Sequence, residues 1–410
     1  MPLTNDAKHG QTGAKSANKT HTLSTYNTDN LPSASENPNR LIVVSDGNNG
    51  SPCLAWSAEG QSWIQLVAGP DVSVPRTPAF FEGFNFFSYW EGHFSGPYST
   101  DGINRQAEIG SNAISIVPTW FTSTTTSSDI FPNVNSEPDS GVIKACQDGV
   151  AAGLAVLVKP HIDIANGAYR GNFVPADPVQ WFANYKVHIL RYAAIAQNNG
   201  ACALSVGCEL ASISGPAYRG YWIDIIHAVR SVFKGKITYA SDWGETKTVS
   251  FWDAVDIIGI DAYVPLSTAS NPSVADIAAG WSLVPSYPEW AHNATNDLSP
   301  IVFYQTLSAQ YGKPVMFTEL GYRNDDDAAK DPGIWSSGTP RNDEMQRRCY
   351  QAYFDVFPGI GAWFIGAQFW AWFPEPDTNI GAKEADVGFS PQTRIAEAAI
   401  ESGFASVNVP

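Results

Sequence analysis

The chain is short of positive charge. It has 24 Lys and Arg residues against 40 Asp and Glu, which gives a formal net charge of −16 over 410 residues. A surface this acidic repels phosphate backbones, so nucleic acid is not an expected partner, and a neutral substrate fits better than an anionic one. The simplest interpretation of the acidity itself is solubility.

Cysteine motifs and long apolar runs are also lacking. Five cysteines occur without CxxC or Cys/His zinc spacing, which indicates reduced, mostly buried thiols. They are Cys53, Cys146, Cys202, Cys208 and Cys349. No basic start followed by an apolar run is visible, and no apolar stretch is long enough to span a membrane. We therefore expect no membrane partner and a cytoplasmic protein by default, or a secreted one if a signal has been removed.

Aromatic residues are what the chain has in excess. They make up 12% of it, including 14 Trp, within a hydrophobic content of 44% that supports a sizeable core. Many aromatics must fill that core. An excess of Trp also suits sugar binding, because the apolar face of a pyranose ring can stack on indole.

The pattern along the chain changes twice. Residues 1–40 are polar with few large apolar side chains, so we expect a flexible tail. Residues 41–78 contain short apolar bursts and are expected to form an N-terminal extension that packs on the main domain. From residue 79 to residue 410, short β-rich runs alternate with longer amphipathic stretches.

That alternation predicts an α/β fold, a (β/α)₈ TIM barrel with an N-terminal polar extension. Eight strands are predicted, at 83–88, 113–117, 154–159, 202–206, 237–240, 256–260, 314–318 and 363–369. Helices are predicted at 181–197, 221–233 and 344–357. The rival fold, a doubly wound open sheet, lacks its usual Gly-rich phosphate loop after the first strand.

Two glutamates stand directly after predicted strands four and seven. In a barrel the carboxyl ends of the strands converge on one face, so Glu209 and Glu319 are expected to share its mouth. Glycoside hydrolysis needs two carboxyl groups, about 5–5.5 Å apart for retention of configuration and about 6.5–9.5 Å apart for inversion. The structural alternative, that each Glu pairs with a Lys or Arg, is weaker for two glutamates placed in this way.

Other strand ends carry further candidates. Tyr263 follows strand six and can donate a hydrogen bond to a carboxylate nucleophile. Trp370 and Trp372 lie two apart, so alternation puts both on one side, with Trp370 the better platform for the reacting sugar. Outer sugar sites are predicted at Trp90 and Trp120, although packing roles fit these two equally well. The same applies to Trp281 and Trp290.

The stretch from about residue 83 to residue 372 resembles glycoside hydrolase family 113, a clan-A family best known for β-mannanases. The segments that carry the resemblance occur in family order. They are Leu157–Asp163, Tyr169–Gly171, Val206–Leu210, Thr238–Trp243, Phe251–Asp253, Asp256–Tyr263, Pro314–Tyr322 and Gln368–Trp370. The resemblance implies Glu209 as acid/base and Glu319 as nucleophile. It also implies a glycone pocket lined by Lys159, His161, Arg170, Trp243, Tyr263 and Trp370.

Three positions depart from the family pattern. Cys208 stands where many clan-A enzymes have Asn, Asp242 where Asn is expected, and Tyr169 where Trp is expected. These differences bear on which sugar is bound and leave the two-carboxylate mechanism intact. Lys159 and His161 also have plainer roles open to them, an ion pair and a loop contact.

The sequence thus predicts a retaining β-glycoside hydrolase whose partner is a β-linked oligo- or polysaccharide, β-mannan first. Alternatives are another clan-A specificity (β-glucanase, β-glucosidase or β-galactosidase) and a catalytically silent carbohydrate-binding or structural barrel. No metal or cofactor is expected, and the acidic run at 325–327 is interpreted as a solvated loop. Endo and exo action both stay open, because loop conformations decide between them.

Overall fold

A computed structural model describes residues 25–26, 30–33, 36, 41–48, 51–58, 62–66, 77–335, 338–374 and 387–407. The chain divides into two compact units, residues 1–67 and residues 68–410. Among the described residues, no helix is both long and apolar enough to cross a bilayer.

The smaller unit is a four-stranded sheet in the order β1-β2-β3-β4. Its strands are β1 (Thr25–Tyr26), β2 (Leu41–Asn48), β3 (Ser51–Ala58) and β4 (Ser62–Leu66). Ile42 and Ala55 are buried in it, with Tyr26 and Leu31 packed against them. Most of the predicted tail lies outside the described residues. The packing of residues 41–78 on the barrel stays a prediction.

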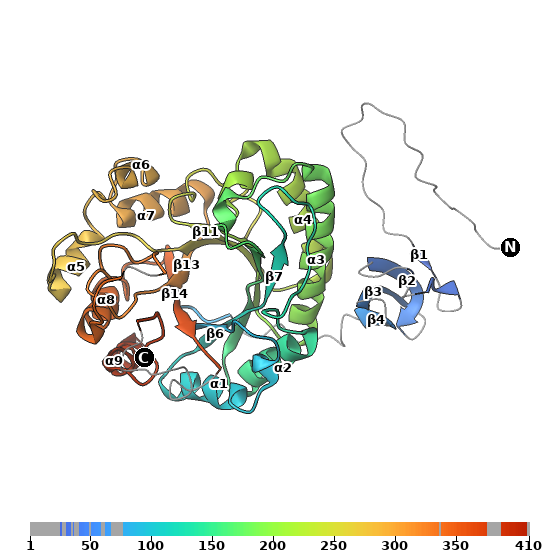
Figure 1. Ribbon diagram of the computed structural model, residues 1–410, viewed down its shortest axis with the longest axis horizontal. Helices are drawn as coiled ribbons and strands as arrows, with labels where there is room; N and C mark the ends of the chain where they lie inside the picture. The colour runs from blue at the N-terminus through green and yellow to red at the C-terminus, as the bar shows by residue number, and fades with distance from the viewer. Residues whose placement is uncertain are drawn as a thin grey trace. The chain divides into compact units, whose positions relative to one another are not determined.

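The larger unit is a closed barrel of eight parallel strands ringed by helices, which confirms the predicted (β/α)₈ fold (Figure 1). All eight predicted segments are barrel strands. They are β5 (Phe81–Phe87), β6 (Ala113–Val117), β8 (Ala155–Val158), β10 (Ala203–Cys208), β11 (Lys236–Asp242), β12 (Ile257–Asp261), β13 (Val315–Leu320) and β14 (Phe364–Trp372). Beyond the ends of β6 and β8, the chain adds a short parallel pair, β7 (Thr119–Thr122) and β9 (His161–Ile164).

Helices follow the strands around the outside. They are α1 (Ser99–Glu108), α2 (Asp139–Ala151), α3 (Pro178–Asn198), α4 (Arg219–Val232), α5 (Val274–Gly280), α6 (Ala291–Ala294), α7 (Pro300–Tyr311), α8 (Asp343–Val356) and α9 (Ile395–Val407). The three predicted helices correspond to α3, α4 and α8. The start of α3 follows from local sequence, because the Asp177 carboxylate accepts from Gln180 N at 3.0 Å and Pro178 occupies the first turn.

Aromatic side chains fill the layer between strands and helices. Phe317 of β13, for example, packs between Trp281 at 5.5 Å and Phe357 at 4.9 Å, measured between ring centroids. Trp281 is therefore a core residue and forms no outer sugar site. Free, buried thiols are also part of this interior, as predicted for Cys146, Cys202, Cys208 and Cys349.

Two predictions about side-chain placement are wrong. Trp372 does not share a face with Trp370: it packs on Phe84 at 4.9 Å, because a register shift between Phe369 and Trp372 breaks the alternation of β14. The acidic run is not fully solvated either. Asp325 is completely buried and pairs with Arg323, and a buried carboxylate needs such a partner.

Closure of the barrel between β14 and β5 depends on Gly366. Its φ is +110°, and an added Cβ would lie 2.0 Å from the Phe81 carbonyl oxygen. We expect Gly366→Ala to lower the free energy of unfolding by more than about 2 kcal/mol, since both backbone strain and a clash are introduced. Chemical denaturation followed by circular dichroism measures this loss.

The matched control is Gly215→Ala. Gly215 has φ −76° and nothing within 4 Å of an added Cβ, so its substitution should change stability by less than about 1 kcal/mol. Equal stability of the two variants would contradict the importance assigned to the close approach at Gly366.

Candidate active site

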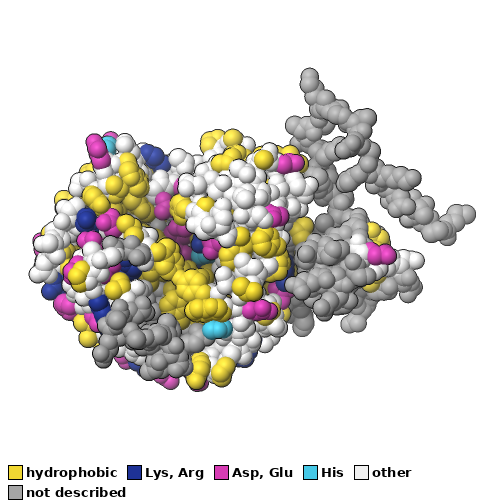
Figure 2. Space-filling view, in the orientation of Figure 1, with side chains coloured by type: hydrophobic (Ala, Val, Ile, Leu, Met, Phe, Trp, Pro, Cys, Tyr) yellow, Lys and Arg dark blue, Asp and Glu magenta, His cyan; other side chains and the backbone are white. Residues whose placement is uncertain are grey.

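A cavity of about 480 Å³ opens at the carboxyl ends of the barrel strands. In Figure 2, apolar side chains gather around a hollow near the barrel axis. The cavity walls hold aromatic rings and a few converging polar groups, the usual makeup of a small-molecule site. Its lining residues are His161, Tyr169, Arg170, Glu209, Asp242, Trp243, Tyr263, Pro265, Pro288, Trp290, Glu319, Asp331, Pro332, Gly333, Ile334, Trp335, Trp370 and Phe389.

A bulge in β13 aims Glu319 into the cavity. Phe317 faces the outer helices and Thr318 faces the barrel interior, so strict alternation would send Glu319 outward. Between Ile260 and Asp261 the pairing register advances two residues on β13, from Phe317 to Glu319. This extra residue turns the Glu319 side chain towards the barrel mouth.

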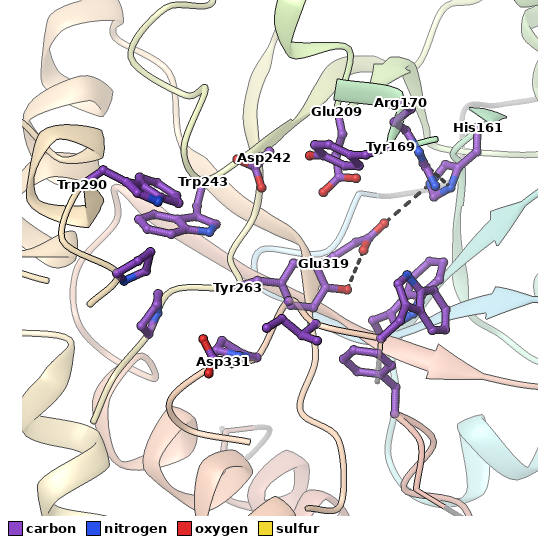
Figure 3. Close-up of a pocket in the computed structure, with 18 residues that line it drawn as sticks. His161, Tyr169, Arg170, Glu209, Asp242, Trp243, Tyr263, Trp290, Glu319 and Asp331 are labelled. Atoms are coloured by element: carbon purple, nitrogen blue, oxygen red, sulfur yellow. Dashed lines mark hydrogen bonds and ion pairs between the residues drawn. The ribbon is translucent and has the colours of Figure 1, made fainter. Parts of the chain in front are cut away.

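Three groups contact the two oxygens of Glu319. Lys159 Nζ lies 2.5 Å from Oε1 and the Tyr263 hydroxyl donates to Oε2 at 2.6 Å. His161 Nε2 lies 3.5 Å from Oε1 (Figure 3). Burial lowers the pKa of Lys159, but the charges of Glu319 and Asp261 outweigh this, and the net pKa is raised. Lys159 therefore remains a cation and stabilises the carboxylate of Glu319.

Glu209 begins the loop after β10 in a strained backbone conformation. Its φ is 51°, in the left-handed region that non-glycine residues rarely occupy. Two bonds to β11 fix this turn: Glu209 N donates to Ala240 O at 2.8 Å, and Leu210 N donates to the Tyr239 hydroxyl at 2.9 Å. The result is a half-buried carboxyl group that projects over the cavity opposite Glu319 (Figure 3).

The surroundings of Glu209 favour its protonated form. Burial raises the pKa of its carboxyl well above the ordinary value, and the negative charges of Asp261, Glu319 and Asp242 raise it further. Arg170 opposes this effect without cancelling it. A carboxyl group with a raised pKa can act as a general acid near neutral pH.

Asp261 lies close enough to both glutamates that its charge acts on Glu209 and the charge of Glu319 acts on it. It is completely buried at the end of β12, accepts from Thr318 Oγ1 at 2.7 Å and receives the Cys208 thiol at 3.3 Å. Burial and the nearby charge of Glu319 raise its pKa to about 7. Cys208, at the position where Asn is expected, thus contacts Asp261.

At one end of the cavity, Arg170 fixes the form of His161. An Arg170 guanidinium nitrogen lies 2.7 Å from His161 Nδ1, and because arginine can only donate, Nδ1 is the acceptor. Burial and the Arg170 charge lower the pKa of His161 well below 6.5, so the ring is neutral with its proton on Nε2. The ring also lies parallel to Trp370, with centroids 5.8 Å apart.

The opposite end of the cavity is walled by indole rings. Trp243 and Trp290 stack with centroids 5.2 Å apart and an angle of 20° between their planes. Asp242 lies between this pair and Glu209 (Figure 3), and burial raises its pKa to about 6. The two glutamates therefore stand between a polar end at His161 and an aromatic end at Trp290.

Most of the predicted site residues meet in this cavity. Glu209, Glu319, His161, Arg170, Trp243, Tyr263 and Trp370 line it, and Lys159 lies beneath Glu319. Trp120 lies outside it, buried under the Arg191 guanidinium, which is 4.5 Å from the ring centroid. Trp90 also lies outside the cavity and is 54% exposed. The roles predicted for these residues stay predictions.

One wall of the site comes from segments that the pattern of strand ends does not predict. Residues 331–335 reach the cavity from the long segment after β13, and Phe389 reaches it from the segment that leads to α9. These positions carry no periodic pattern, because their placement depends on tertiary contacts. In the sequence, the close spacing of Asp331, Pro332, Gly333 and Trp335 is the feature that could have indicated a loop at the binding site.

His161, Cys208 and Glu319 bring ligand atoms within 4.8 Å of one another, as do Cys208, Glu209 and Asp261. In the first group the Lys159 ammonium already contacts Glu319 Oε1, and its positive charge opposes a metal cation there.

A parallel barrel with two glutamates facing each other at its carboxyl end has the arrangement of a barrel glycoside hydrolase. The sequence profile of Glycoside Hydrolase Family 113 matches residues 83–391, and the chain belongs to this family. No curated protein matches the chain.

Solved structures share the fold at low identity. The GH113 β-mannanase AaManA from Alicyclobacillus acidocaldarius, in complex with ManMIm, is 22% identical with a TM-score of 0.68, covering 80% of this chain and 98% of that one. A GH113 β-1,4-mannanase in complex has 22% identity and a TM-score of 0.67, covering 80% and 99%. A GH5_18 enzyme from Streptomyces cattleya, in complex with Manβ1-4GlcNAc, has 14% identity and a TM-score of 0.53, covering 80% and 82%.

The raised pKa of Glu209 predicts how hydrolysis depends on pH. On the prediction that Glu209 is the acid, cleavage of a substrate with a poor leaving group needs its protonated form, so kcat/KM should fall as pH rises through the Glu209 pKa. That fall should lie above the range of an ordinary glutamate. With a dinitrophenyl leaving group, which needs no proton, the alkaline fall should disappear. Identical alkaline limbs for both substrates would contradict the assignment of Glu209 as acid.

Proposed function

We propose that the protein is a retaining β-glycoside hydrolase that cleaves β-mannan or manno-oligosaccharides. The observation that carries the proposal is the unequal pair of carboxyl groups across one cavity. Glu319 is held by a lysine ammonium and a tyrosine hydroxyl, while burial and neighbouring carboxylates raise the pKa of Glu209. One group is thus suited to attack and the other to give up a proton.

In the first step, a Glu319 oxygen attacks the anomeric carbon and the glycosidic C–O bond breaks. The Glu209 proton passes to the departing oxygen, so the leaving sugar departs as a neutral alcohol. Lys159 and Tyr263 hold the attacking carboxylate in place through their contacts with Oε1 and Oε2. A covalent glycosyl–Glu319 ester remains.

In the second step, Glu209, now a carboxylate, removes a proton from water. The water oxygen attacks the same anomeric carbon, the bond to Glu319 breaks, and Glu209 is protonated again. Two displacements at one carbon give a product with retained configuration. Arg170, which opposes the rise in the Glu209 pKa, stabilises the charged form of Glu209 during this step.

Mannose is favoured as the sugar by family membership and by the β-mannanases among proteins of similar fold. Another clan-A specificity is the nearest alternative, because two residues that depart from the family pattern lie at the site. Asp242 lines the cavity, and Cys208 contacts Asp261. A silent binding barrel is less favoured, since both carboxyl groups and the partners of Glu319 are present.

The test is a hydrolysis screen on β-mannan, manno-oligosaccharides, β-glucans, xylan and aryl β-glycosides. Wild type is compared with Glu209→Gln and Glu319→Gln, and Glu401→Gln on the exposed face of α9 is the matched control. We expect both site variants to lose about a hundredfold or more in kcat, while the control keeps wild-type rates. Cleavage of a glucan but not a mannan would correct the sugar and keep the mechanism.

The roles of the two glutamates can be separated with azide. Azide should restore turnover of an aryl β-glycoside by Glu209→Ala and give the β-glycosyl azide. With Glu319→Ala it should give the α-glycosyl azide, because a single displacement inverts the carbon. Nuclear magnetic resonance of the products distinguishes the two anomers. The same anomer from both variants, or inverted product from wild type, would overturn the retaining mechanism.

A further inference from the structure

Glu245 carries a buried carboxyl group that the two displacement steps do not use. It lies in the turn after β11, is 5% exposed and is not one of the residues that line the cavity. Asp242, three residues earlier, does line the cavity (Figure 3). One carboxyl group of this turn therefore faces the substrate site and the other faces the protein interior. Burying a carboxyl group costs free energy unless it has polar partners, so the partners of Glu245 define its role.

Those partners lie at the two ends of the segment that follows Glu209. Burial and the charge of Asp242 raise the pKa of Glu245 well above its ordinary value, and a hydrogen bond with the Tyr239 hydroxyl opposes that rise. At the far end of the segment, Ser214 Oγ lies 3.5 Å from Glu245 Oε2. Glu245 thus contacts the support of this segment at its beginning and at its end.

Tyr239 connects Glu245 to Leu210, the residue after the acid/base. The Tyr239 hydroxyl accepts from Leu210 N at 2.9 Å, and a tyrosine hydroxyl that accepts one hydrogen bond still has its own proton to donate. The Glu245 carboxyl group is the partner for that proton. The Tyr239 ring is held in place by Trp222 and Phe251, with centroids 5.4 and 5.1 Å away. A continuous set of contacts therefore runs from the buried carboxyl group to the acid/base turn.

The backbone at Glu209 needs this support. Its φ of 51° is unfavourable for a residue with a Cβ, so the turn relaxes unless hydrogen bonds hold it. One of the two bonds that hold it ends on the Tyr239 hydroxyl. Without its acceptor this hydroxyl is free to rotate and binds Leu210 N less firmly. Proton transfer requires the donor within hydrogen-bond reach of the leaving oxygen, so even a small displacement of the Glu209 carboxyl group slows it.

We propose that Glu245 is a positioning residue for the acid/base Glu209 and acts through the Tyr239 hydroxyl and Leu210 N. The inference rests on the proposed function and goes further, because it extends the machinery of proton transfer to a residue outside the cavity. Glu245 touches no sugar and exchanges no proton with one. Its loss should therefore slow only the steps in which Glu209 gives or takes a proton.

The test compares two aryl β-glycosides of the sugar that wild type cleaves. A phenyl leaving group needs the Glu209 proton, whereas a dinitrophenyl leaving group does not. In Tyr239→Phe and Glu245→Ala, kcat/KM for the phenyl glycoside should fall by about tenfold, the value of one hydrogen bond. For the dinitrophenyl glycoside it should stay within about twofold of wild type. The ratio of the two rates does not depend on the folded fraction, so a loss of stability alone cannot produce this pattern.

The second displacement gives an independent readout. When the leaving group departs fast, turnover depends on attack of water on the glycosyl–enzyme, which needs Glu209 as base. In both variants kcat for the dinitrophenyl glycoside should therefore fall, and azide, which needs no base, should restore it. Glu245→Gln keeps an acceptor oxygen for the Tyr239 proton and should recover most of the wild-type kcat/KM on the phenyl glycoside.

Action through Tyr239 is tested with the double variant Tyr239→Phe/Glu245→Ala. If the two residues act in series, the double variant should be slower than Tyr239→Phe on the phenyl glycoside by no more than about twofold. Separate losses that multiply to about a hundredfold would mean that Glu245 acts by another route, and the proposal would be wrong.

The matched control is Tyr322→Phe. Tyr322 is also buried, and its hydroxyl has no hydrogen-bond partner within the part of the chain that the structure describes. This variant should keep the wild-type ratio of rates on the two glycosides. Equal losses on both glycosides in Glu245→Ala, or no loss on either, would overturn the positioning role and leave the proposed function intact. Wild type that cleaves neither glycoside, nor any sugar of the screen, would overturn the proposed function and this inference together.

Discussion

The contact between Lys159 and Glu319 inside the barrel mouth is the interaction on which the site depends. A completely buried ammonium group is costly unless an anion faces it, and the Glu319 carboxylate is equally costly without a cation. Each group therefore stabilises the charged form of the other. Lys159 follows β8 and Glu319 lies in β13, so only a closed barrel brings them together.

The remaining charges around this pair are unbalanced, and the imbalance separates the two glutamates. Glu209, Asp242 and Asp261 add three carboxyl groups, whereas Arg170 is the further cation whose charge acts on Glu209. Lys159 is committed to Glu319, so burial, together with the remaining negative charge, raises the pKa values of the other carboxyl groups. An acid and a nucleophile arise from the same residue type because one has a lysine partner and the other does not.

The sequence predicted two kinds of feature: the repeating strand–helix pattern, and the strand-end residues that converge on one face of the barrel. Eight apolar runs at βα spacing are sufficient for the barrel, and the topology of any parallel barrel places Glu209 and Glu319 on one face. What could not be predicted depends on single backbone irregularities and on loops. The bulge that turns Glu319 inward, the shift that sends Trp372 outward and the return of Trp335 to the cavity are set by register and tertiary packing. Residue-type patterns do not encode these details.

The left-handed backbone of Glu209 has a consequence for how this position can evolve. Glycine would adopt that conformation without strain, so the residue that the fold itself prefers there is one without a carboxyl group. Relaxed selection on hydrolysis would then let the position drift towards glycine or asparagine while the barrel became more stable. Stability alone favours loss of the glutamate at this position. Its conservation in relatives of this chain would therefore indicate continuous selection for catalysis.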